Sequence, residues 1–192
     1  MTALDHELEQ VAGLIDALPR TSQAALFWAA SSAHLDSVDW WTAEHGEVGA
    51  LLQQAQEAAY AFCMDRLPVD RAGVLLYELD QTLPEDVVAQ SSWICADAAL
   101  RIAVDPTFEP GRSIEYALEP VLGRTSERLF GFWQVGSGDA QEDEVAEIMA
   151  QSDVVSAIEF CRWAVRMLAA AGAPSADGLE AIRIRAADLT DS

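Results

Sequence analysis

Lysine is absent from this chain of 192 residues, and its 11 basic residues, all arginines, stand against 32 aspartates and glutamates. The formal net charge is therefore −21 at pH 7. A surface this negative repels phosphate backbones and anionic membranes. We therefore expect binding neither to nucleic acid nor to a membrane, whereas a basic protein partner would be attracted. The alternative is that the acidity only keeps the protein in solution.

Cysteine and histidine are scarce, which limits the metal and nucleophile chemistry open to the chain. Cys63, Cys95 and Cys161 are widely spaced, form no CxxC pair and lie in apolar helical patterns. We expect them to be buried thiols of a reducing cytoplasm. None of the three histidines belongs to an HExxH motif or follows a glutamate by three residues, as a di-iron bundle requires. The sequence predicts no metal site and no cofactor.

Motifs of catalysis are also missing. There is no GxSxG, and "GSG" at 136–138 lacks the spacing and the lysine of a phosphate loop. We therefore expect a protein that is not an enzyme. Long apolar runs are missing too, because the longest, "AALFWAA", is far shorter than a membrane span. The first residues, "MTALDHELEQ", lack the basic and apolar regions of a signal peptide, so we expect a cytoplasmic protein.

Helical periodicity is what the sequence has in abundance, and no segment shows the alternation of a strand. It predicts one compact all-α domain over residues 1–192, with about eight to ten helices. We expect helices over about 2–18, 21–34, 48–63, 74–79, 85–104, 114–122, 129–133, 152–172 and 176–189. The helix over 85–104 is the most apolar, which places it at the centre of the domain.

Local signals predict how several of these helices begin and end. Thr2 and Ser152 are expected to cap their helices, and Thr82 with Glu85 has the spacing of a capping box. Pro120 predicts a kink or a break within the segment after residue 114. The stretch "QVGSGDAQEDEVAE" at 134–147 is the most loop-like part of the chain, because two glycines precede a run of acids.

Two pairs of polar residues stand one helical turn apart. Asp97 and Arg101 are four residues apart, and we interpret them as a structural polar pair rather than a catalytic site. Glu115 and Glu119 could form a general acid/base couple. The alternative is a solvated helix face on which Arg112 lies one turn before Glu115.

Two segments are candidates for binding a protein partner. The acid run contributes Asp139, Glu142, Asp143, Glu144 and Glu147, and no basic residue interrupts it. It would present a negative patch to a cationic protein surface. The stretch "HLDSVDWWTAEHGE" at 34–47 predicts a short helix between two longer ones, and its adjacent Trp40 and Trp41 are candidate interface anchors.

Three segments carry a family resemblance: "ALFWAASSAHLDSVDWWTAEHG", "LDQTLPEDVVAQSSWICADAALRIAV", with Trp93, Asp97 and Ala98 at matching positions, and "SIEYALEPVLGRTSERL" followed by "SDVVSAIEFCRWAVRML". Over residues 20–171 the chain resembles the YjaG-like family, all-helical bacterial proteins of undefined function. It also resembles the helical immunity proteins of polymorphic toxin systems. The resemblance implies an all-helical fold and supplies no catalytic residues.

Charge and resemblance together predict an immunity or antitoxin protein. It would bind a basic partner, a cognate toxin, and neutralise it by occlusion and acidic charge complementarity. The alternative is a stand-alone, non-enzymatic cytoplasmic protein with a housekeeping or adaptor role, for which a homodimer remains open.

Overall fold

Helices make up all of the regular secondary structure that the computed structural model describes, in residues 2–33, 46–66, 69–82, 84, 87–131 and 142–190. This confirms the predicted all-α class, and nine α-helices in these ranges agree with the expected number. The elements are α1 (Ala3–Asp16), α2 (Arg20–Ala33), α4 (Gly46–Cys63), α5 (Val69–Asp80), α6 (Val87–Val104), the 3-10 helix η1 (Pro110–Ser113), α7 (Ile114–Phe130), α8 (Glu142–Met149), α9 (Ser152–Ala171) and α10 (Ala176–Thr190).

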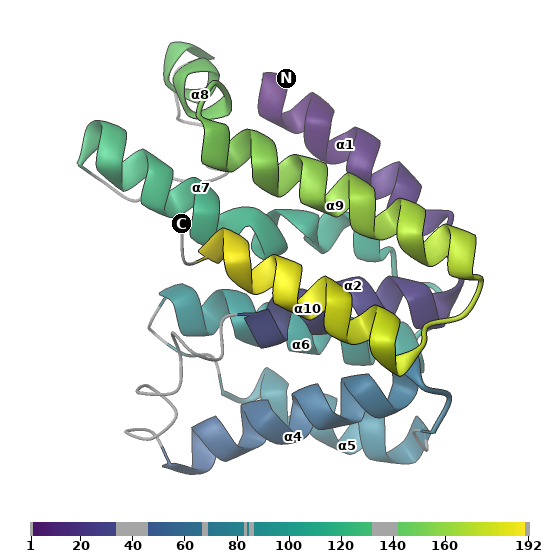
Figure 1. Ribbon diagram of the computed structural model, residues 1–192. Coiled ribbons are helices and arrows are strands. Elements are labelled where there is room, and N and C mark those ends of the chain that lie inside the picture. Colours follow the sequence, from purple (N-terminus) through teal and green to yellow (C-terminus); the bar gives the residue numbers. More distant parts are fainter. Residues whose placement is uncertain are drawn as a thin grey trace.

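The helices stack in layers around α2 and α6, which pack closely against each other (Figure 1). On one side of this central pair lie α4 and α5, and on the other lie α1, α7 and α9, with α8 at the outer end. The last helix, α10, lies across α2 and also contacts α9. Because α6 contacts α2, α4, α5 and α7, the predicted central position of the apolar helix is confirmed.

The most enclosed helix is α2, in which all twelve residues from Ser22 to Ala33 are buried. Its composition explains this position, because alanines and serines take little space and let neighbouring helices approach closely. Hydrogen bonds between buried polar groups connect α2 to α6 and to α4. Ser31 donates from its hydroxyl to the Ser92 carbonyl of α6 at 2.8 Å, and Gln56 of α4 donates to the Ser31 carbonyl at 3.0 Å.

Pro120 does not break the helix in which it lies, so of the two outcomes expected there, a kink or a break, the break is wrong. It lies inside α7, which continues to Phe130 and ends at Gly131 with a left-handed φ of 75°. Proline removes one backbone donor, a loss that buried neighbours can outweigh. Leu118, Val121 and Leu122 are all buried, so tertiary packing holds the helix together across the proline.

Two predictions about the segment before α9 are also wrong. The loop expected over 134–147 contains α8 from Glu142 onward, because Val145 and Ile148 bury an apolar side against the domain. The predicted cap, Ser152, is the first residue of α9, and Gln151 occupies the capping position, where its side chain makes no capping hydrogen bond to α9. At the start of the chain, by contrast, Thr2 caps α1, and its hydroxyl accepts from the Asp5 amide at 3.2 Å.

One guanidinium group, at the start of α2, binds the end of α6 and the segment that follows it. Arg20 donates to the carbonyls of Ile102, at 2.9 Å, and Phe108, at 2.9 Å, and also to the carbonyl of Asp105. These carbonyls lie at or just beyond the C-terminus of α6, where no helical donor is available to them. We call this site the Arg20 junction.

Candidate functional site

Four of the five acids in the predicted patch are brought together on α8. Glu142, Asp143 and Glu144 occupy its first turn, and Glu147 follows about one turn later. Glu142, Asp143 and Glu147 are exposed, and within the described ranges none of these three forms an ion pair. We call these four residues the α8 acidic face. Negative charge in the first turn is favoured by the helix dipole, so the helix itself stabilises the acids there.

The inward side of α8 fixes the direction in which the acidic face points. Val145 and Ile148 are buried against neighbouring helices, and α8 contacts α1, α7 and α9. Figure 1 shows α8 at the periphery, next to the first part of α1 and the start of α9. The remaining members of the predicted binding set, Asp139, Trp40 and Trp41, lie outside the described residues, as does the short helix expected around the tryptophans.

The polar pair on α6 is present and is joined by a third residue. Arg101 donates from Nε to Asp97 Oδ2 at 2.6 Å and from a terminal nitrogen to Asp80 of α5 at 2.5 Å. Burial raises the pKa of Asp97, and the hydrogen bond and charge of Arg101 offset this only in part. The sequence spacing identified the Asp97–Arg101 pair but gave no sign of Asp80, which reaches it from another helix. This cluster clamps α5 to α6.

Glu115 and Glu119 have different surroundings in the structure. Glu119 accepts a hydrogen bond from the buried hydroxyl of Ser91 on α6 at 2.7 Å. Glu115 lies half-buried near α1, and burial, followed by the charges of Glu119 and Asp5, raises its pKa. Arg112 pairs with Glu109 at 2.8 Å, so the pairing with Glu115 suggested for a solvated face is not formed.

A groove that the sequence did not predict lies between α2, α4 and α10. Its volume is about 590 Å³, and its lining includes Trp28 of α2, Gln56, Glu57 and Tyr60 of α4, and Arg183 of α10. The rings of Trp28 and Tyr60 are tilted by 52°, with their centroids 5.2 Å apart. We call this site the α4 groove. No sequence motif could have indicated it, because its residues come from three helices and span more than half of the chain.

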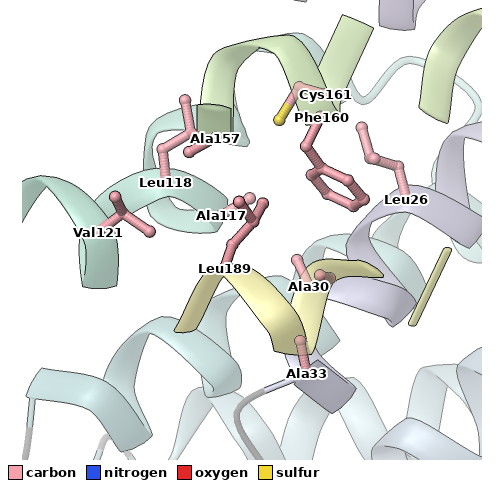
Figure 2. A pocket seen from close by; sticks show the side chains of 11 residues that line it. Leu26, Ala30, Ala33, Ala117, Leu118, Val121, Ala157, Phe160, Cys161 and Leu189 are labelled. Carbon is pink, nitrogen blue, oxygen red and sulfur yellow. The ribbon is translucent and has the colours of Figure 1, made fainter. Parts of the chain in front are cut away.

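A small cavity lies at the junction of α2, α7, α9 and α10, and Figure 2 shows its labelled side chains converging from these helices. Alanine, leucine, valine and phenylalanine side chains and the Cys161 thiol line it, and its volume is about 30 Å³. Ligand pockets are typically ten or more times larger, at about 300–1,000 Å³. The cavity is therefore a packing gap and too small for a metabolite.

The three cysteines are buried, as predicted, and none forms a disulfide. Burial raises the pKa of the Cys63 and Cys161 thiols to about 12 and also raises that of Cys95. At neutral pH these groups are protonated thiols, which are poor nucleophiles and poor metal ligands.

In the part of the chain that the structure describes, no group of three or more histidine, cysteine, aspartate or glutamate side chains is arranged to hold a metal ion. Among the same residues, no helix has the combination of length and apolarity needed to cross a bilayer.

Comparisons with known proteins give no relative. No protein-family model matches the chain, and neither a curated protein nor a solved structure matches it. The resemblance to the YjaG-like family and to helical immunity proteins therefore stays a prediction from sequence.

Proposed function

We propose that this protein is an immunity or antitoxin protein that acts in the cytoplasm and neutralises a cognate, basic toxin by covering its surface. The observation that carries the proposal is the α8 acidic face. Within the described residues its exposed members Glu142, Asp143 and Glu147 are in no ion pair, so their charge is available to a cationic partner.

Three further properties support a binding protein over an enzyme. The net charge of −21 attracts a basic partner over a long range at low salt. The acidic face is built on a helix whose apolar side is buried, so the backbone that carries its charges is in place before binding. The described thiols are all buried and protonated, and they offer no nucleophile.

The test is co-expression with the product of an adjacent gene, followed by calorimetry on the purified pair. We expect the protein to restore growth that the toxin arrests and to form a complex that weakens as salt is added. The triple variant Glu142→Gln/Asp143→Asn/Glu147→Gln should weaken that complex about tenfold, since each lost charge pair contributes up to about 1 kcal/mol.

A matched control removes the same amount of charge elsewhere. Asp70→Asn/Glu78→Gln/Asp177→Asn neutralises three exposed acids on α5 and α10, neither of which packs against α8. This control should keep the affinity of the unmodified protein to within about twofold, the effect expected of a general loss of attraction. If both triple variants lose affinity equally, the binding surface is not the α8 acidic face. If the adjacent gene product neither arrests growth nor binds, the proposed function is wrong.

A further inference from the structure

The α4 groove carries a negative charge, that of Glu57, which no other described residue of the groove neutralises. Arg183 holds both carboxylate oxygens of Glu180, at 2.9 and 2.8 Å, so the cation in the wall already has a counter-charge. Glu57 is exposed on the α4 side of the groove, and in the described ranges no residue pairs with it. The charge available to an incoming group is therefore negative.

The aromatic lining of the α4 groove adds a second attraction for cations. Trp28 is 8% exposed and backs the more accessible ring of Tyr60, with 5.2 Å between the centroids. Aromatic faces attract cations through their quadrupole, and a planar guanidinium stacks on a ring as well. A lysine ammonium is a strongly hydrated point charge and uses such a surface less well.

The groove is formed before any ligand arrives. Gln56, at its floor, is 5% exposed and donates to both the carbonyl and the hydroxyl of Ser31, at 3.0 and 2.9 Å. Those bonds fix the spacing of α2 and α4 beneath the two rings. A site held in this way loses little conformational freedom on binding, which increases affinity.

We propose that the α4 groove receives an arginine side chain of the basic protein partner, which stacks on Tyr60 and pairs with Glu57. This inference rests on the proposed function, since it names the chemistry by which the partner is held. At about 590 Å³ the groove takes the guanidinium together with neighbouring atoms of the partner segment. The α8 acidic face then attracts the partner by charge, while the groove selects arginine.

The test uses the protein alone, with Nα-acetyl-arginine amide as the probe and Nα-acetyl-lysine amide as its charge-matched control. In an NMR titration at low salt, arginine should shift the indole N–H of Trp28 and the amide of Tyr60 and should bind more tightly than lysine. Glu57→Gln and Tyr60→Leu should each weaken arginine binding about two- to fivefold. Glu159→Gln, which removes the same charge from an exposed site on α9, should leave it unchanged.

Three outcomes would overturn the inference. Equal binding of the two probes, with shifts on α8 instead of α4, would mean that general charge attraction explains the binding. If Glu57→Gln binds arginine as tightly as the unmodified protein does, the groove is not the binding site. Glu57 is exposed, so its substitution should not affect folding, and the test stays valid even if Tyr60→Leu does not fold. Self-association that Tyr60→Leu abolishes would identify a second copy of this chain as the occupant.

The probe experiment and the partner experiment fail independently. If arginine binds in the groove but no toxin is found, the preference of the groove for arginine stands, whereas the immunity proposal and the identity of the partner fall. If a toxin binds with the same affinity to Tyr60→Leu and Glu57→Gln, the immunity proposal stands and the groove inference falls.

Discussion

At the Arg20 junction, polar groups are directed inward, whereas on α8 they are directed outward. One guanidinium satisfies three carbonyls at the end of α6, and nearby the Gly111 amide donates to Asp16 at 3.0 Å. On α8, the exposed members of the acidic face form no ion pair within the described residues. Polar residues of the first region are used for folding, and those of the second are available for binding. Substitutions should therefore separate the two regions by their effect on stability.

The largest effect is expected at the centre of the junction. Arg20→Ala removes the donors to Ile102, Asp105 and Phe108, and hydrogen bonds from a charged group each contribute about 1.5–3 kcal/mol when buried. Because the site is only partly buried, we expect a total loss of about 2–3 kcal/mol in the free energy of unfolding. Urea denaturation followed by circular dichroism measures it. Arg20→Lys, which keeps the charge but loses the fork of donors, should recover less than half.

The second-largest loss of stability is expected from a steric clash at Gly111, not from a lost hydrogen bond. A Cβ at Gly111 would lie 2.8 Å from Cβ and from the carbonyl oxygen of Ala12, and equally close to the Asp16 carboxylate. Backbone atoms cannot give way, so Gly111→Ala should cost about 2 kcal/mol through overpacking.

A second glycine serves as the control for this substitution. Gly13 lies inside α1 with nothing within 4 Å of an added Cβ. Gly13→Ala should therefore stabilise the protein by up to about 1 kcal/mol, because alanine favours a helix. If the two variants melted at the same temperature, the close contact at the junction would be disproved.

Apolar periodicity was enough to predict most of the helices, but not which residues meet. The apolar composition of α6 correctly placed that helix at the centre, since apolar residues on several of its sides pack against neighbouring helices. The burial of α2 was not predicted, because Ser31 is a polar residue whose hydrogen-bond partners lie on other helices and cannot be read from the sequence. α8 was missed because its acids outnumber the two buried residues that anchor it.

The candidate sites also differ in how far the sequence could predict them. The α8 acidic face could be predicted because its members lie within six consecutive positions, so they stay close in space on any short helix or loop. The α4 groove could not, because Trp28 and Arg183 come together only after packing, and neither belongs to a motif. Arg20 also gave no signal, since its acceptors are backbone carbonyls more than eighty residues away.

Two partly buried carboxylates, Asp97 and Asp153, should affect the pH dependence of stability with opposite signs. Burial raises the pKa of Asp97 above its ordinary value of 3.8, despite Arg101. Its contribution to stability is present at acidic pH and is lost as the pH rises through the folded-state pKa. Burial also acts to raise the pKa of Asp153, but the hydrogen bond from Thr125 and the charge of Arg128 outweigh it and lower the pKa below 3.8. Its contribution is present above that value and is lost as the pH falls through the folded-state pKa.

Denaturation from about pH 3 to pH 6 tests both signs, because this interval brackets the ordinary aspartate pKa. The stability of the unmodified protein relative to Asp97→Asn should decrease as the pH rises. Relative to Asp153→Asn, it should increase. Slopes of the same sign would show that one of the two environments is described incorrectly.

The smallest effect is expected on α8. The triple variant Glu142→Gln/Asp143→Asn/Glu147→Gln loses a favourable interaction with the helix dipole but also relieves repulsion within a chain of charge −21. These effects oppose each other, so the free energy of unfolding should change by less than about 0.5 kcal/mol.

The opposite side of the same helix supplies the comparison. Ile148 is 7% exposed, and Ile148→Ala should cost about 2 kcal/mol, because it removes the apolar anchor of α8. A small change in the triple variant beside a large one in Ile148→Ala would show that packing alone holds α8. The acids would then be free to determine binding without affecting the fold. If the triple variant were as unstable as Ile148→Ala, the acidic face would have a structural role and would belong with the Arg20 junction.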